Sequence, residues 1–145
     1  MYFLVQLKRA RVPAKDLVAY YCACIRSSLD YACPFFHYFL PQYLQSELES
    51  VQKRALVCIF PRTPYREALE RACLTSIREH HKDITKSLFR SISKNQDSKL
   101  HHLIPEAYSP HYIFRHQRTY SVPAARTKCF STLFSVKCAA VTNSS

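Results

Sequence analysis

The chain reads SIREHHKDITKSLFRSISKN over residues 76–95, and this stretch decides the fold class. Ser76 and Glu79 form the Ser-x-x-Glu pattern of a helix N-terminal capping box. Aliphatic side chains recur on one side of the wheel at Ile77, Ile84, Leu88 and Ile92. The pattern predicts an amphipathic helix that runs to Lys94 and ends at Asn95, because asparagine tolerates the left-handed conformation of a helix end. His81 falls in the apolar arc, which favours a partly buried, hydrogen-bonded structural histidine.

The opposite side of this helix carries cations at four-residue steps: Arg78, Lys82, Lys86, Arg90 and Lys94. These side chains cover an arc of about 160°, and successive cations rise by about 6 Å. That rise is close to the spacing of phosphates along a nucleic-acid strand, so the row fits phosphate neutralisation. A solvated outer face is an equally good interpretation, although like charges at i,i+4 destabilise an isolated helix by about a few tenths of a kcal/mol per pair.

Prolines divide the chain upstream of this helix into further helical segments. Helices are predicted from Met1 to Arg11, between Pro13 and Cys33, and between Pro41 and Pro61, because a residue before proline leaves the α region. The second has a stripe formed by Leu17, Tyr21, Cys24, Ser28 and Tyr31. The third has an apolar seam formed by Leu44, Leu48, Val51, Ala55 and Cys58. A short aromatic turn or helix is predicted over Phe35–Leu40. Shorter helices are predicted over Tyr65–Cys73 (with Thr63 as N-cap and Pro64 as first helical residue) and Ser98–Ile104.

The C-terminal part of the chain has a different composition. Residues 107–145 have scattered Pro, Ser and Thr and no sustained period, and their charged side chains are all basic: Arg115, Arg118, Arg126, Lys128 and Lys137. The best strand signal, at Tyr112–Phe114, is weak. We therefore expect an all-α chain, with a small bundle of about five helices in residues 1–105 and a basic, irregular, poorly ordered tail in residues 106–145.

Composition excludes several classes of function. The chain of 145 residues contains no glycine, so it has no glycine-rich dinucleotide or phosphate loop and no nucleophile elbow. Its formal net charge is +11, which favours anionic partners. The longest uncharged stretch, Tyr31–Ser46, contains two prolines and is shorter than the about 20 apolar residues of a membrane span. Since the N-terminus does not read as a signal peptide, we expect an intracellular protein, nuclear or cytoplasmic, without membrane contact.

Cysteine and histidine do not form a recognisable catalytic or metal site. The chain has 7 Cys and 7 His, and reduced thiols are the expected state in an intracellular protein. Two groups are close in sequence but lack the spacing of a structural zinc site: Cys22, Cys24, Cys33 and His37, and His111, His116, Cys129 and Cys138. No pair of adjacent carboxylates is available to hold catalytic Mg²⁺. We therefore expect no catalytic residue, metal or cofactor.

A second basic group lies near the N-terminus and consists of Lys8, Arg9, Arg11 and Lys15. Four cations in eight residues are a candidate contact for a nucleic-acid backbone. A basic helix C-terminus that is favoured by the helix dipole explains the same residues equally well.

Short words distributed along the chain carry a family resemblance. The first are Tyr2-Phe3-Leu4, Gln6-Leu7-Lys8-Arg9-Ala10, Asp16-Leu17, Ile25-Arg26-Ser27, Leu29-Asp30-Tyr31-Ala32-Cys33-Pro34 and Leu40-Pro41. The next are Val51-Gln52-Lys53-Arg54-Ala55-Leu56, Glu67-Ala68-Leu69, Leu88-Phe89, Leu100-His101 and Leu103-Ile104-Pro105. In this order and spacing they resemble the C-terminal region, thumb and post-thumb, of reverse transcriptases from non-LTR (LINE-type) retrotransposons. The resemblance covers residues 1–105, and residues 106–138 more loosely.

The resemblance implies a truncated, non-catalytic fragment. In such enzymes the thumb holds the template–primer duplex while the palm performs the chemistry, and the palm's Tyr-x-Asp-Asp word is not in this chain. The partner implied is an RNA–DNA hybrid or another duplex, bound without sequence preference. The chain departs from the family at His80-His81, where a basic pair is usual. Two alternatives stay open: a degraded retrotransposon relic without selected function, and a helical protein-interaction module that uses the seam.

Overall fold

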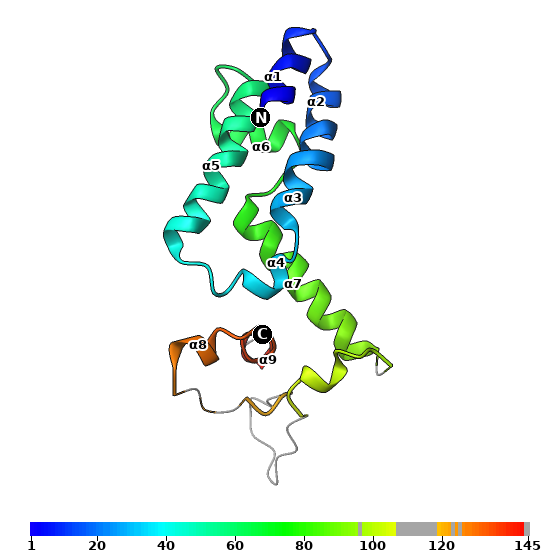
Figure 1. Cartoon of the computed structure of the whole chain (residues 1–145), viewed down its shortest axis with the longest axis vertical. Helices are drawn as coiled ribbons and strands as arrows, with labels where there is room; N and C mark the ends of the chain where they lie inside the picture. The colour runs from blue at the N-terminus through cyan, green and yellow to red at the C-terminus, as the bar shows by residue number, and fades with distance from the viewer. Residues whose placement is uncertain (96, 107–118, 123, 125, 144–145) are drawn as a thin grey trace. The chain divides into compact units, whose positions relative to one another are not determined.

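The structure of the chain is a computed structural model that describes residues 1–95, 97–106, 119–122, 124 and 126–143 (Figure 1). All regular secondary structure in these residues is helical, with no β-strand among them, so the all-α prediction is confirmed. The predicted strand Tyr112–Phe114 lies outside the described residues. The chain folds into two compact units, the first made of Met1–Cys33 and Leu40–His81 and the second of Pro34–Phe39 and Lys82–Ser145.

Prolines start three helices of the first unit. α1 spans Tyr2–Arg9, α2 spans Ala14–Tyr20, α5 spans Gln42–Ile59 and α6 spans Tyr65–Arg71. Pro13, Pro41 and Pro64 occupy the N-caps of α2, α5 and α6, each extended with ψ between 146° and 151°. The prediction that Thr63 caps α6 is wrong by one residue, because the extended Pro64 stands outside the helix.

The core of the first unit joins three helices. Leu4 of α1, Leu17 of α2, and Ala55 and Ile59 of α5 are at most 1% exposed, and they pack together with the buried ring of Tyr21. A fully buried leucine or isoleucine stabilises a fold by about 1.5–3 kcal/mol. These contacts are therefore the main force that holds α1 and α2 against α5.

A π-helical segment corrects the stripe predicted between Pro13 and Cys33. This segment, η1 (Tyr21–Arg26), connects α2 to α3 (Ser27–Asp30). Its wider turns, with i→i+5 hydrogen bonds, rotate the residues that follow relative to an α-helix. Past Tyr21 the buried position is therefore Arg26, while Cys24, Ser28 and Tyr31 are exposed.

The helices of the first unit end without glycine. Four residues with positive φ follow helix C-termini, Arg11 (61°), Ala32 (54°), Arg62 (66°) and Cys73 (53°). At Arg11 and Cys73 the hydrogen bonds are those of a Schellman motif, such as Leu74 N–H to Leu69 O at 2.9 Å. A side chain with a Cβ destabilises this conformation by about 1–2 kcal/mol. The absence of glycine thus lowers the stability of the fold at four helix ends.

The second unit is built around an aromatic core. It holds most of α7 (Ile77–Lys94) and of α4 (Cys33–Phe36), the 3₁₀ turn η2 (His101–Leu103), α8 (Lys128–Ser131) and α9 (Phe134–Asn143). The ring of Phe89 meets those of Tyr120 and Phe134 edge-on, at 5.5 and 6.1 Å between centroids. Cys138 and Ala139 of α9 are buried against Phe89. Edge-to-face packing of this kind adds about 0.5–1.5 kcal/mol per pair beyond area burial.

Helices α8 and α9 correct the expectation of an irregular tail and, with the shorter segments upstream, raise the helix number above about five. The sequence predicts an irregular tail here because Pro, Ser and Thr are scattered through residues 107–145 and the apolar residues have no sustained period. The apolar residues Val136, Cys138 and Ala139 are nevertheless all buried, so α9 packs through a broad face. Among the described residues, no helix has the length and apolarity needed to cross a membrane.

Candidate nucleic-acid interface

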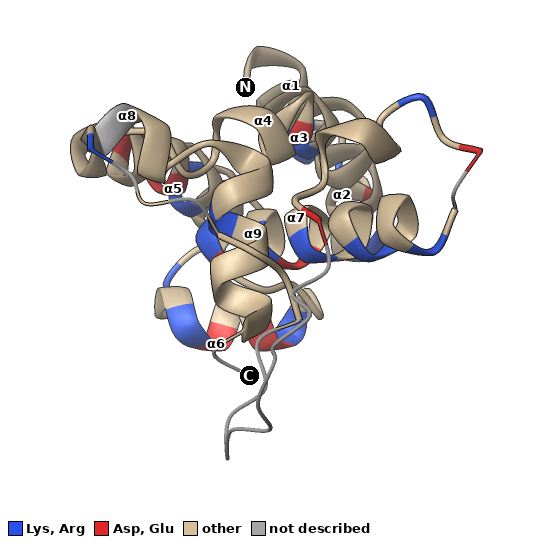
Figure 2. Cartoon of the chain, turned by 90° about the horizontal axis from the view of Figure 1, so that it is seen from below, with Lys and Arg blue, Asp and Glu red and all other residues tan. Residues whose placement is uncertain are grey.

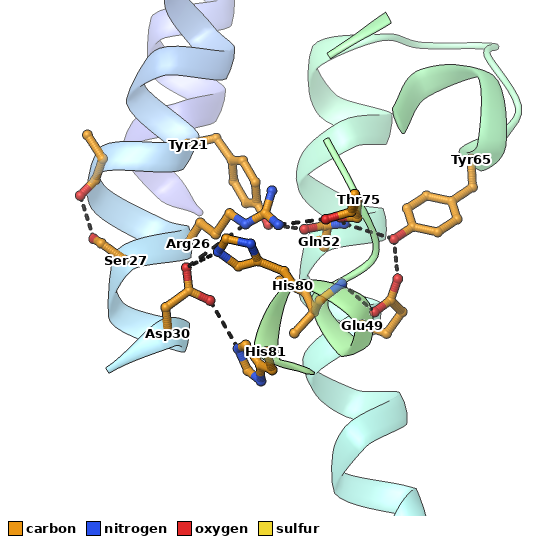
Figure 3. A network of polar contacts seen from close by, with 12 residues as sticks. Tyr21, Arg26, Ser27, Asp30, Glu49, Gln52, Tyr65, Thr75, His80 and His81 are labelled. Carbon is orange, nitrogen blue, oxygen red and sulfur yellow. Dashed lines mark hydrogen bonds and ion pairs between the residues drawn. The ribbon is translucent and has the colours of Figure 1, made fainter. Parts of the chain in front are cut away.

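The N-terminus of α7 is held by two carboxylates. As the capping box predicts, the Glu79 N–H donates to Ser76 Oγ at 3.3 Å. The Glu79 carboxylate accepts from the Ser76 hydroxyl at 3.0 Å, whereas the box predicts a bond from the Ser76 backbone N–H. Glu49 of α5 supplies a further acceptor, since the Ile77 N–H donates to its Oε2 at 3.0 Å (Figure 3). Carboxylates stabilise a helix N-terminus because they accept from free N–H groups and oppose the positive end of the dipole.

One side of α7 is buried along its whole length. Its buried side chains are Ile77, His81, Thr85, Phe89 and Ile92. Ile84 and Leu88, which the sequence placed in the apolar arc, are half-buried at its border. α7 therefore has one defined inner face, and the helix bounds Ile77–Lys94 agree with the prediction.

The cations predicted on the opposite side are exposed. Figure 2 shows the basic residues in blue along α7, and all members of the row are exposed: Arg78, Lys82, Lys86, Arg90 and Lys94. We call this row the basic ridge. In the part of the chain that the structure describes, no carboxylate forms an ion pair with any of them. The ridge is therefore a run of positive charge without direct ion pairs in the described residues, on a helix whose opposite face is buried.

In the N-terminal basic group, Lys8 makes a capping contact and the other three residues are exposed. The Lys8 ammonium donates to the Ile59 carbonyl at 2.9 Å, which caps the C-terminus of α5. Arg9 ends α1, Arg11 has the left-handed conformation after it, and Lys15 lies in the first turn of α2, all three exposed. Only these three are free of a capping contact, and they lie in the first unit, whereas Lys82, Lys86, Arg90 and Lys94 lie in the second.

A polar network in the first unit includes His80 and His81, the pair at which the chain differs from the family that it resembles. Nε2 of His80 and Nε2 of His81 each lie 3.0 Å from a different oxygen of Asp30, and Asp30 is also 4.0 Å from Nε of the buried Arg26 (Figure 3). Burial lowers the pKa of His81, although the Asp30 carboxylate opposes that shift. The prediction of a partly buried, hydrogen-bonded histidine at His81 is confirmed for the hydrogen bond, and the burial is more complete than predicted, since the residue is 2% exposed.

A second branch of this network joins α5 to α6. The Tyr21 hydroxyl donates to Gln52 Oε1 at 3.0 Å, and Gln52 Nε2 donates to Tyr65 Oη and to the Thr75 carbonyl, both at 3.0 Å. The Tyr65 hydroxyl in turn donates to Glu49. Burial is the main cause that raises the pKa of both tyrosines, so their hydroxyls stay protonated donors. We interpret the network as structural, because its polar groups are used to connect helices.

The sequence did not reveal Asp30 and Glu49, because most of their partners are distant along the chain: Tyr65 and Ile77 lie 16 and 28 residues from Glu49, and the two histidines lie 50 and 51 residues from Asp30. The scarcity of acidic residues, 10 against 21 basic ones, is the one signal in the sequence that could have pointed to them. Among the described residues, no group of three His, Cys, Asp or Glu side chains is arranged to hold a metal ion. Comparison of the chain with family models, with curated proteins and with solved structures gives no match.

Proposed function

We propose that this chain is a non-catalytic module that binds the phosphate backbone of duplex nucleic acid without sequence preference. The observation that carries the proposal is the basic ridge: exposed cations at four-residue steps, unpaired with carboxylates in the described residues, on a helix with a buried opposite face. The partner we propose is an RNA–DNA hybrid or DNA duplex. The resemblance to the thumb of non-LTR retrotransposon reverse transcriptases supports that choice, and an intracellular location, nuclear or cytoplasmic, follows from it.

Electrostatics supports the proposal in three ways. Like charges at i,i+4 along the ridge repel by about a few tenths of a kcal/mol per pair, and phosphates relieve this repulsion when they bind. Each cation that neutralises a phosphate also releases a condensed counterion, which adds a favourable, salt-dependent term. With a formal net charge of +11, the chain attracts polyanions over a longer range as well.

The experiment compares two variants of equal charge. In the ridge variant Lys82, Lys86, Arg90 and Lys94 are replaced by glutamine. In the control variant the replaced residues are exposed cations of the first unit: Lys53, Arg54, Arg62 and Arg66. Fluorescence anisotropy then gives the Kd for a labelled DNA duplex and for an RNA–DNA hybrid over a series of salt concentrations, after circular dichroism has shown that helix content is retained.

The expected results follow from counterion release. The slope of log K against log salt falls by about 3.6 units in the ridge variant on B-DNA, since each lost contact contributes about 0.9. The control variant keeps most of the wild-type slope. Equal slopes for the two variants would mean that binding reflects net charge alone, which would refute the role of the ridge.

A second candidate function rests on the N-terminal half of α5. The seam residues Leu44, Leu48 and Val51 are only half-buried, and with Leu40 they line a hollow of about 400 Å³ in the first unit. A partner helix with an apolar stripe would complete this seam. A second copy of the chain is the simplest such partner, so sedimentation velocity of the wild type and of Leu48→Lys tests it. Self-association that Leu48→Lys abolishes would support a second copy as the partner of the seam. A chain that stays monomeric at all concentrations would exclude that partner.

A further inference from the structure

A cavity of about 320 Å³ lies wholly within the second unit, beside the basic ridge. Its volume falls at the lower end of the range for small-molecule sites, about 300–1,000 Å³. Its lining combines aromatic rings with cations, and the residues that matter here are Tyr38, Lys86, Phe89, Arg90, Lys94 and Tyr120. Such a combination selects for a ligand that is both flat and anionic.

The aromatic part of the cavity is held rigidly. Phe89 is 3% exposed, and the ring of Tyr120 stands against it at an interplanar angle of 76°. The Tyr120 N–H donates to Asn143 Oδ1 at 3.0 Å, and Asn143 Nδ2 donates back to the Tyr120 carbonyl at 2.9 Å. The Tyr120 hydroxyl donates to Ser93 Oγ at 3.2 Å. Bonds at both ends of the residue therefore fix the ring before any ligand arrives, which reduces the entropy lost on binding.

The charged part of the cavity is purely cationic. Lys86, Arg90 and Lys94 line one side, and no carboxylate is among the described residues that line the cavity. Cys138, also in the lining, does not offset this charge, because burial raises the pKa of its thiol to about 11. The site is thus positive at neutral pH, with a neutral aromatic wall.

We propose that this cavity binds a nucleoside phosphate, with the base against Tyr120 and the phosphate on Lys86, Arg90 and Lys94. Aromatic side chains stack on every base, and paired lysine and arginine groups hold phosphate. The inference extends the proposed function, since the same cations serve both. The nucleotide comes either from solution or from an unpaired end of a bound duplex, and the two sources share this chemistry.

Calorimetric titration at low salt tests the site with three probes: AMP, adenosine and inorganic phosphate. Because base and phosphate are recognised together, AMP binds at least about tenfold more tightly than either part alone. Tyr120→Leu removes the ring while keeping an apolar side chain of similar bulk, and AMP affinity falls by about tenfold. The matched control is Tyr43→Leu, on an exposed tyrosine of α5, which leaves AMP affinity unchanged. Equal affinity for AMP and phosphate, or no effect of Tyr120→Leu, would overturn the proposal.

A duplex with a one-nucleotide overhang and a blunt duplex of the same sequence distinguish the two sources. Preference for the overhang that Tyr120→Leu abolishes assigns the site to an unpaired strand end, and equal binding of the two duplexes with retained AMP binding assigns it to free nucleotide. The same titrations separate this inference from the proposed function. Blunt-duplex binding without AMP binding overturns the cavity alone, and AMP binding without duplex binding overturns only the role of the ridge.

Discussion

Replacing Asp30 by asparagine should remove the charge that compensates a buried arginine. Arg26 is 5% exposed, and its Nη2 makes one long hydrogen bond, 3.4 Å, to the Thr75 carbonyl. Its Nε has no hydrogen-bond partner and lies 4.0 Å from Asp30 Oδ2. Asp30 is thus the anion on which the placement of Arg26 depends, and it also accepts from His80 and His81.

The magnitude follows from the burial of the pair. Removing one partner of a buried ion pair destabilises a protein by about 3–5 kcal/mol, because the remaining charge is left uncompensated. The Asp30 side chain is 19% exposed, so solvent screening places the effect near the lower end, at about 3 kcal/mol. Asparagine keeps the shape but only one acceptor oxygen, so one of the two histidine contacts loses its acceptor together with the charge.

Urea unfolding at pH 7.5, followed by circular dichroism, measures the free energy of unfolding of Asp30→Asn against a matched variant. Glu70→Gln removes a carboxylate from an exposed ion pair, in which Arg66 and Glu70 are 94% and 71% exposed. Such pairs contribute about 0–1 kcal/mol. If both variants lose the same small free energy, the Asp30 network does not stabilise the first unit and the reasoning above is wrong.

Three further predictions concern the same unit and use the same unfolding assay. Ala32→Gly, at φ 54°, stabilises by about 1 kcal/mol or somewhat less, since relief of left-handed strain exceeds the added chain entropy; a loss of stability would contradict this. Glu49→Gln weakens the acceptor of the Ile77 N–H and destabilises by about 1–2 kcal/mol; no change would show that Ser76 alone caps α7. Burial lowers the pKa of His81 below its ordinary value of 6.5, so the unfolded state binds the proton more readily, and stability falls as pH drops through 6.5. His81→Gln flattens that dependence, and an unchanged profile would assign it to other groups.

The sequence predicted features that depend on near neighbours. The bounds of α7, its capping serine and the burial of His81 follow from spacing within a few residues, and the structure confirms them. The stripe past Tyr21 was wrong because a π-helical turn has no signature in apolar spacing. α9 was missed because its buried residues do not form the single narrow stripe that marks an amphipathic helix.

In the candidate site, too, the features set by near neighbours could be predicted, and those set by tertiary contacts could not. The exposure of the basic ridge was predictable, since the charged face of an amphipathic helix lies opposite its buried face and is in contact with solvent. The capping role of Lys8 was not, because its acceptor, the Ile59 carbonyl, is 51 residues away. The cavity of the second unit depends on Tyr120 and Cys138, which reach Phe89 only through tertiary packing. Periodicity therefore identified the ridge but not the aromatic wall beside it.

The most direct test of the central claim is a lysine footprint. The chain is treated with an amine-acylating reagent with and without saturating RNA–DNA hybrid, and mass spectrometry gives the modification rate of each lysine. Duplex should protect Lys82, Lys86 and Lys94, while Lys53, an exposed lysine of α5, keeps its rate. Ridge lysines that react equally fast in free and bound chain, or protection of Lys53 to the same extent, would contradict backbone binding by the ridge.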